Sequence, residues 1–287
     1  MSRLIHVILA AALAVFAAGA TLASAAGPSA QLDSADLYIF VSPCDFSHRA
    51  KDDLIVFPGK PGAAHSHDFF GNRSTNARST RSNMLGRSSS CSRVGDTAAY
   101  WVPTLSQAGR ALTPVKSEIY YRADGGGAAS VKPHPAGLRM ISGNSKATTP
   151  QGAHIATWHC GVESNGGFDR RSEVPLCASG RQLHLQVRFQ DCWDGRRLDS
   201  TDHQSHLAYS AYNRCPSSHK VRLPRIAFNV RYPTRGGPGV TFSSGSRHSA
   251  HADFLNSWNQ DGLNRLVRDC INNGPVPQHR PPCAAPR

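Results

Sequence analysis

Short runs in which apolar and polar residues alternate make up much of the chain. The clearest is residues 183–190, where Leu183, Leu185, Val187 and Phe189 would share one face of an extended strand. Similar runs recur along the chain, and clusters rich in Gly, Pro and Ser separate them. The further strands that we expect cover residues 36–41, 53–57, 99–103, 115–121, 137–141, 154–160, 226–232 and 239–242.

Helical spacing is clear only near the C-terminus. Apolar residues between Leu263 and Ile271 recur three and four positions apart, and Asp261 is placed to cap this helix. Residues 254–258 suggest a short helix just before it. Many short strands and little helix predict an all-β-dominated chain. We expect a single β-sandwich or jelly-roll domain over residues 36–272, with a C-terminal helix and disulfide bonds.

The N-terminal residues have the pattern of a secretory signal. A short positive start precedes the apolar run 4–22, and Ala23-Ser24-Ala25 forms a cleavage motif. We therefore expect residues 1–25 to be a signal peptide and residues 26–35 to be a flexible mature N-terminus. A transmembrane anchor is the alternative interpretation. At the other end, residues 273–287 indicate a Pro-rich tail.

Eight cysteines follow the cleavage motif, and none belongs to a Cys-x-x-Cys pair. This arrangement in an exported chain is typical of disulfides rather than of zinc ligands. Pairing of neighbours, Cys160 with Cys177 and Cys192 with Cys215, closes the shortest loops at the least entropic cost. Residues 72–93 are too polar to pack, and we expect a surface loop held by Cys91.

The formal net charge is +13, which favours anionic partners. An anionic or cell-wall polysaccharide is the partner that we expect. Charge that only serves solubility is an alternative interpretation. Nucleic acid is supported by charge alone, and we do not expect it as a partner.

Three stretches are rich in histidine and aspartate, and we expect them to meet in one pocket: residues 64–71, 191–209 and 247–254. Histidine pairs beside aspartates suit acid/base chemistry or a zinc or copper site. The candidate acid/base residues are Asp202, His203, His206 and Tyr209. The candidate binding residues are Arg188, Trp193, Asp194 and Asp253. The candidate metal ligands are His65, His67, His248 and His251.

Each of these residues also has a purely structural interpretation. His65 and His67 could cap a turn, His203 could satisfy backbone groups, and His248 could be exposed in its Ser/Gly-rich loop. No His-Glu-x-x-His helix and no Gly-x-Ser-x-Gly elbow occurs in the sequence, so neither a known zinc motif nor a nucleophilic triad supports the site.

Several motifs resemble a family of secreted domains of unknown function found in actinobacteria and filamentous fungi. The motifs that carry the resemblance, in order between residues 38 and 270, are His65-Ser66-His67-Asp68-Phe69-Phe70-Gly71, Cys192-Trp193-Asp194-Gly195, Asp202-His203-Gln204-Ser205-His206-Leu207-Ala208-Tyr209 and His251-Ala252-Asp253-Phe254. The resemblance implies a cell-wall or extracellular glycan context and supplies no reaction. We therefore expect a secreted protein that acts on extracellular polysaccharide, as a lyase or hydrolase. A non-catalytic glycan-binding module and an extracellular metal-binding protein are the alternatives.

Overall fold

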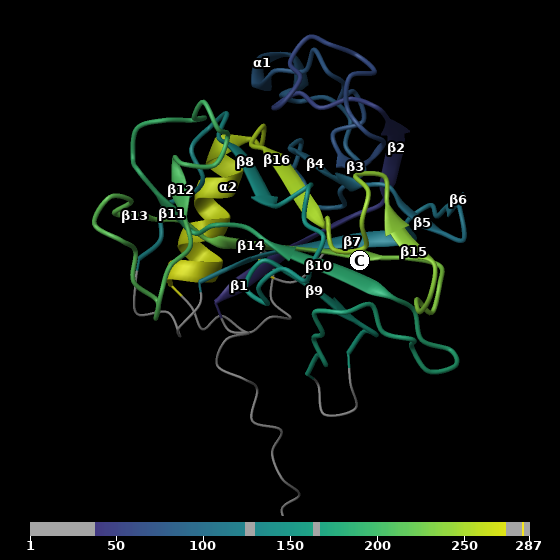
Figure 1. Cartoon of the computed structure of the whole chain (residues 1–287). Coiled ribbons are helices and arrows are strands. Elements are labelled where there is room, and N and C mark those ends of the chain that lie inside the picture. The colour runs from purple at the N-terminus through teal and green to yellow at the C-terminus, as the bar shows by residue number, and fades with distance from the viewer. Residues whose placement is uncertain (1–37, 124–129, 163–166, 274–282, 284–287) are drawn as a thin grey trace, which may run out of the picture. The chain divides into compact units, whose positions relative to one another are not determined.

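Two five-stranded antiparallel sheets form the body of the computed structural model (Figure 1). The first sheet has the order β1 (Ile39–Cys44), β7 (Lys116–Arg122), β14 (Arg225–Arg231), β10 (His184–Arg188) and β9 (Ala156–His159). The second sheet has the order β2 (Phe46–Ala50), β3 (His67–Gly71), β4 (Ala99–Pro103), β16 (His251–Leu255) and β8 (Arg139–Gly143).

The structure describes residues 38–123, 130–162, 167–273 and 283. These residues lie in one unit that spans residues 33–287. The expected signal peptide (1–25), the expected flexible segment (26–35) and nearly all of the expected tail (273–287) lie outside the described residues.

Two small sheets and three helical segments complete the described elements. One small sheet contains β15 (Val240–Phe242), β5 (Leu105–Gln107) and β6 (Arg110–Ala111). The other contains β12 (Leu207–Ala208), β11 (Cys192–Trp193) and β13 (Val221–Arg222). The helices are α1 (Arg81–Met84) and α2 (Gln260–Leu266), which continues as the π-helix Val267–Asn272. No helix in the described ranges has the length and apolar character needed to cross a membrane.

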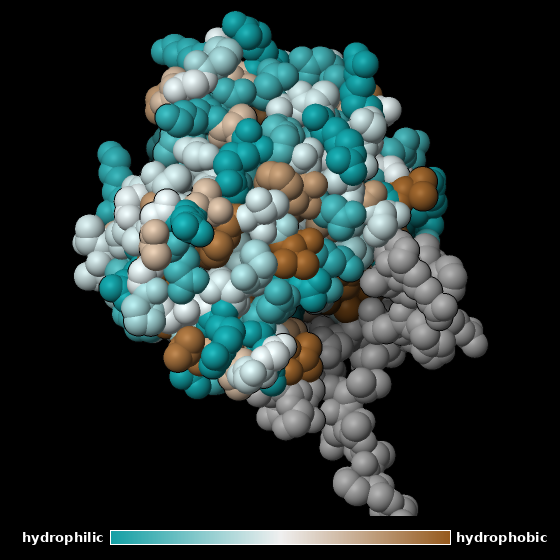
Figure 2. Space-filling view, turned by 90° about the vertical axis from the view of Figure 1, so that its right-hand side faces the viewer, coloured by the Kyte–Doolittle hydropathy of each residue, from teal (hydrophilic) through white to brown (hydrophobic). Residues whose placement is uncertain are grey.

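The main core lies between the two large sheets. Phe228 of β14 contacts Phe70 of β3 and Tyr100 of β4, with ring centroids 5.4 and 5.9 Å apart. Leu263 of α2 and Ile271 of the π-helix are buried in the same cluster. Packing of the two inner faces and of the C-terminal helix confirms the predicted β-rich sandwich. The side of the molecule drawn in Figure 2 is mostly hydrophilic, with hydrophobic residues scattered over it, as on a water-exposed surface.

Four disulfides cross-link the chain. They join Cys44 to Cys91, Cys160 to Cys177, Cys192 to Cys215 and Cys270 to Cys283. The two predicted neighbour pairs are confirmed, and Cys91 fixes the end of the loop after β3 to the first sheet. This cross-linking is typical of proteins that fold in an oxidising compartment.

Three local predictions were wrong. Residues 53–57 form a turn, because the Asp53 side chain accepts hydrogen bonds from the backbone N–H groups of Ile55 and Val56. Residues 254 and 255 end strand β16 and do not begin a helix, and they are apolar because both faces of this central strand are buried. The polar segment 72–93 does pack, since its Met84 is fully buried.

One buried carboxyl, Asp96, links the ends of several strands. Its oxygens accept hydrogen bonds from the hydroxyl groups of Ser42 and Tyr100 and from the backbone N–H of Ala98. Burial raises the pKa of Asp96 to about 7, although these hydrogen bonds act in the opposite direction.

This raised pKa should make stability depend on pH. The stabilising contribution of Asp96 is complete below its unfolded pKa of 3.8 and is lost as the pH rises through about 7. Between pH 4 and pH 8 the free energy of unfolding should therefore fall by about 4 kcal/mol relative to Asp96→Asn. Urea unfolding of both proteins across this range measures the difference, and parallel pH profiles would contradict the prediction.

Candidate functional site

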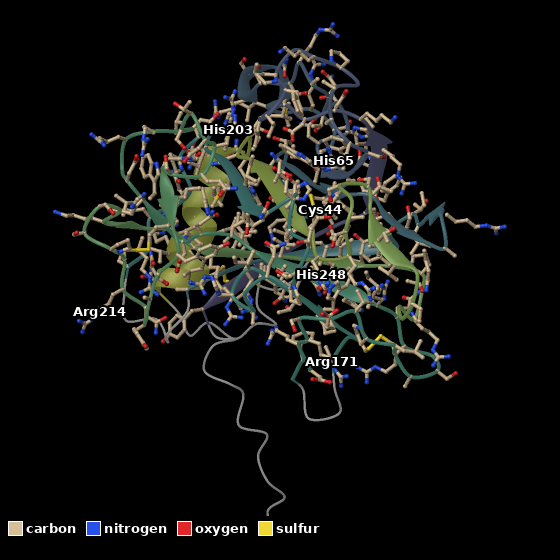
Figure 3. All side chains as sticks on the ribbon, in the orientation of Figure 1. Cys44, His65, Arg171, His203, Arg214 and His248 are labelled. Atoms are coloured by element: carbon tan, nitrogen blue, oxygen red, sulfur yellow. A yellow bond between two sulfur atoms is a disulfide. The ribbon has the colours of Figure 1, made fainter. Side chains whose placement is uncertain are left out.

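A pocket of about 750 Å³ lies at one end of the second sheet and receives residues from all three histidine-rich stretches. His251 begins β16 and lies directly opposite Gly143 at the end of β8. His65 precedes β3, and Asp202 and His203 come from the turn between β11 and β12. In Figure 3, His65 and His203 both lie in the upper half of the view, whereas His248 lies lower.

Gly143 allows the two strands to approach at the pocket. Its φ of +91° is unfavourable for other residues, and a Cβ atom there would lie 2.5 Å from the backbone oxygen of Ala250. The glycine therefore helps to fix the register that places His251 and Asp253 beside the pocket.

Three histidines, His65, His67 and His251, form a cluster that we call the histidine cluster. One ring nitrogen of each lies within 4.8 Å of the corresponding atoms of the other two. The Nε2 atoms of His65 and His251 are 3.1 Å apart. Nitrogens bound to one tetrahedral zinc ion are about 3.3 Å apart, so this spacing is close to that of two ligands of a shared ion.

Backbone carbonyl groups orient two of the three rings. Nδ1 of His67 lies 2.9 Å from the carbonyl oxygen of Asp52, and Nδ1 of His251 lies 2.9 Å from that of Ser249. Each Nδ1 must therefore carry the proton and donate it, which leaves Nε2 with a lone pair. Metal-binding histidines are commonly held in this way. Nε2 of His67 is buried and has no hydrogen-bond partner.

The surroundings keep the three rings neutral. Burial lowers the pKa of His65, and burial together with the other two histidines lowers the pKa of His67 well below its usual value. Burial also lowers the pKa of His251 to about 4. Neutral imidazole is the form that binds a metal ion.

Two buried carboxyl groups, Asp53 and Asp253, lie next to the histidine cluster. A carboxylate oxygen of each lies within 4.8 Å of a ring nitrogen of His67. Burial and the charge of Asp53 raise the pKa of Asp253 well above its usual value, and burial also raises that of Asp53. One oxygen of Asp253 is buried without a hydrogen-bond partner. Buried carboxylates of this kind are normally neutralised by protonation or by a cation.

His203 enters the pocket from another direction and is held by a carboxylate. Its Nδ1 lies 2.9 Å from Oδ1 of Asp199, and Oδ2 of Asp199 lies 3.2 Å from Arg139. The backbone of His203 has the left-handed conformation, with φ of 58°. Asp199 therefore orients His203 so that Nε2 is the nitrogen left for proton exchange in the pocket.

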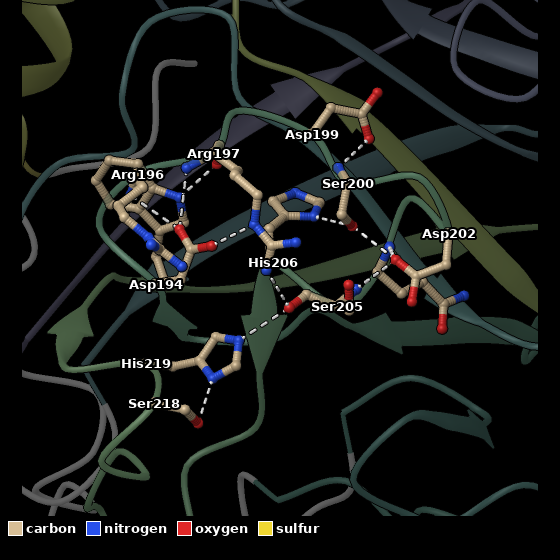
Figure 4. A network of polar contacts seen from close by, with 12 residues as sticks. Asp194, Arg196, Arg197, Asp199, Ser200, Asp202, Ser205, His206, Ser218 and His219 are labelled. Atoms are coloured by element: carbon tan, nitrogen blue, oxygen red, sulfur yellow. Dashed lines mark hydrogen bonds and ion pairs between the residues drawn. The ribbon is translucent and has the colours of Figure 1, made fainter.

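His206 and Tyr209, the other expected acid/base residues, do not line the pocket. His206 is fully buried, and one ring nitrogen contacts Ser200 Oγ at 2.9 Å (Figure 4). The other ring nitrogen contacts the backbone oxygen of Arg139 at 2.7 Å. Burial raises the pKa of Tyr209 to about 12, and its hydroxyl bonds to Ser142 and to the backbone oxygen of Arg188. His206 supports the turn that carries His203, whereas Tyr209 links the chain after β12 to β8 and β10.

Asp202 does line the pocket, but its Oδ1 mainly organises the turn. It accepts hydrogen bonds from the backbone N–H groups of Ser205 and Gln204 and from the Ser200 hydroxyl (Figure 4). These bonds lower the pKa of Asp202 and keep its carboxylate ionised.

The expected binding residues other than Asp253 lie outside the pocket. Arg188 bonds to Gln186 and to the backbone oxygen of Ala153. The indole of Trp193 donates to the backbone oxygen of Arg197 at 2.6 Å.

Asp194 accepts hydrogen bonds from Arg197 and Arg196 (Figure 4). Burial acts to raise the pKa of Asp194, but these bonds outweigh it and lower the pKa to about 2. His248, expected as a metal ligand, instead faces Glu173, with 3.9 Å between Nε2 and Oε1.

Asp53 and Arg139 were not predicted as members of the site, whereas Asp199 lies in the predicted stretch 191–209 and only its contact with His203 was not predicted. Residues 53–57 were predicted as a strand, although an aspartate side chain can accept hydrogen bonds from backbone N–H groups two and three residues further on and so form a turn. Asp199 lies four residues before His203, and that spacing was the available indication of their contact.

Fold and site together define a disulfide-linked antiparallel β-protein with a pocket of histidines and carboxylates. Residues 53–258 match the family model described as "Domain of unknown function (DUF1996)", so the chain belongs to this family. No curated protein and no solved structure matches the chain.

Proposed function

We propose that the pocket is the active site of a metal-dependent extracellular enzyme that acts on polysaccharide. The observation that carries the proposal is the convergence of His65, His67 and His251 beside two buried carboxyl groups, Asp53 and Asp253. Three neutral imidazoles suit zinc or copper, and a carboxylate supplies a further ligand and the balancing charge.

The pocket supports hydrolytic or lyase chemistry through its own side chains. A bound divalent ion would act as a Lewis acid and lower the pKa of a bound water to about 7. His203 is placed to take up a proton and later to return it, and Asp199 stabilises the charged ring. The open side of the pocket, which includes Asn144, Gln204 and Ser244, offers polar groups to a substrate.

Several features favour a sugar polymer as the substrate. The volume of about 750 Å³ accommodates one or more sugar units. Phe57 supplies an aromatic surface, and Lys146 supplies a cation for an acidic sugar. The four disulfides agree with action outside the cytoplasm.

The test combines metal analysis with polysaccharide cleavage. Secreted, oxidised protein should contain about one zinc or copper ion per chain, lose activity with a chelator and regain it when that ion is restored. Acidic and neutral polysaccharides are then tested for new reducing or unsaturated ends. Metal binding without cleavage would favour an extracellular metal-binding protein, and retention of glycan without cleavage would favour a binding module. Active protein free of metal would exclude the proposed chemistry.

A further inference from the structure

A row of four basic side chains crosses the outer face of the first sheet, away from the histidine cluster. The strand register pairs His159 with His184, His184 with Arg231, and Arg231 with Lys116, across β9, β10, β14 and β7. Burial lowers the pKa values of His159 and His184 to about 4, so the like-charge pair in the row is Arg231 opposite Lys116. Like charges directly opposite on neighbouring strands destabilise a sheet. This pair therefore has a cost in fold stability that an opposing negative charge would remove.

Polar atoms in this row are buried and lack partners. Nε of Arg231 and Nδ1 of His184 are both buried without a hydrogen bond. Among the ion pairs of the described residues, none includes Arg231 or Lys116. An unpaired guanidinium that is partly removed from water is a strong candidate for binding an anion.

The hydrogen bonds of the His159 ring leave the side-chain N–H groups of Asn229 available as donors. Backbone N–H of Gly161 donates to Nδ1 of His159, so the proton of His159 is on Nε2. That Nε2 lies 3.0 Å from Oδ1 of Asn229 and must donate to it. The oxygen of Asn229 is thereby occupied, and its amide N–H groups remain for a ligand.

Two adjoining cavities lie along this row. One of about 90 Å³ is lined by Lys116, Glu118, His184, Asn229 and Arg231, and has room for about three water molecules. An open cavity of about 350 Å³ shares His184 and Arg231 with it. Glu118 is the one acid in the lining, and its carboxylate accepts a hydrogen bond from Tyr120.

We propose that this row, which we call the basic row, is a second binding site that takes a sulfate or phosphate ester group of an anionic polymer. The small cavity would hold the oxyanion against Arg231, Lys116 and Asn229, and the open cavity would leave room for the attached chain. The net charge of +13 attracts such a polymer over a longer distance. The site lies on different strands from the histidine cluster and does not depend on its function.

Calorimetry with defined probes tests the proposal. Dextran sulfate should bind in 0.15 M salt, neutral dextran should not, and inorganic sulfate should compete. Arg231→Gln and Lys116→Gln should each weaken dextran sulfate binding by about tenfold. The matched control is Arg110→Gln on β6, which removes the same charge and should change affinity by less than about twofold.

Two results would overturn the proposal. The first is no binding of dextran sulfate by folded protein, and binding of inorganic sulfate alone in that case would indicate a site for free anions. The second is an equal loss of affinity in all three variants, which would indicate an effect of net charge alone. His203→Gln should leave dextran sulfate affinity unchanged, so failure of the enzymatic proposal is distinguished from failure of this one.

Discussion

Alanine at both His67 and His251 should abolish stoichiometric metal binding. These two rings present buried Nε2 lone pairs, and neighbouring side chains could not replace them without moving the backbone. Loss of a residue that only orients a ligand already lowers metal affinity by about 10–100-fold, so loss of two ligands should exceed that range. Elemental analysis and competition with a chromophoric chelator measure the change. The matched control is His248→Ala, which removes a histidine near Glu173 and should retain the ion.

Asp253→Asn should separate metal binding from fold stability. In metal-free protein this change removes a buried carboxyl that lies beside Asp53, so the unfolding midpoint should rise by about 3 °C. A free ion concentration of 100 times the Kd should stabilise the parent by about 2.7 kcal/mol, and the variant should lose most of this gain. Thermal unfolding with and without zinc measures both effects. Equal zinc stabilisation of parent and variant would remove Asp253 from the site.

His203→Gln should lower turnover by about 10²–10⁴-fold while the metal content stays unchanged. Glutamine preserves the approximate size of the side chain but cannot carry a proton between water and substrate. The comparison uses kcat and KM on the polysaccharide that the parent cleaves. A fall in kcat with little change in KM is expected, because His203 acts in proton transfer rather than in ground-state binding.

Asp199→Asn tests whether the carboxylate positions His203. Without the carboxylate that orients the His203 ring, kcat should fall while the metal content and KM stay close to those of the parent. His206→Gln serves as the contrast, since His206 is buried in the supporting turn. It should lower stability without a comparable fall in kcat of the folded protein. An unchanged kcat in Asp199→Asn would exclude the positioning role.

Much of the fold could be predicted because its strands are amphipathic. Leu183, Leu185, Val187 and Phe189 are all fully buried, as alternation along this strand requires. Neighbour pairing of cysteines was also a sound guide, since short loops favour it. Strand β16 was missed because its residues are buried on both faces, which removes the alternation that identifies a strand.

The candidate site was predictable at the level of stretches and less so for individual residues. His203 and His206 are three positions apart and have similar neighbours in the sequence. The positive φ of His203 and the two hydrogen bonds of the His206 ring separate their roles, and both are tertiary effects. Asp53 lies in the site because residues 53–57 form a turn, whereas the apolar residues 54–57 had predicted a strand.

Strand β16 lies between β4 and β8 but is the last of the described strands in chain order. A growing chain cannot complete the second sheet before residues 251–255 emerge, so β4 and β8 each keep an unpaired edge until then. His251 arrives with this strand, and the histidine cluster is therefore assembled at the end of folding. Chains truncated before residue 251 should consequently aggregate rather than accumulate as a partly active product.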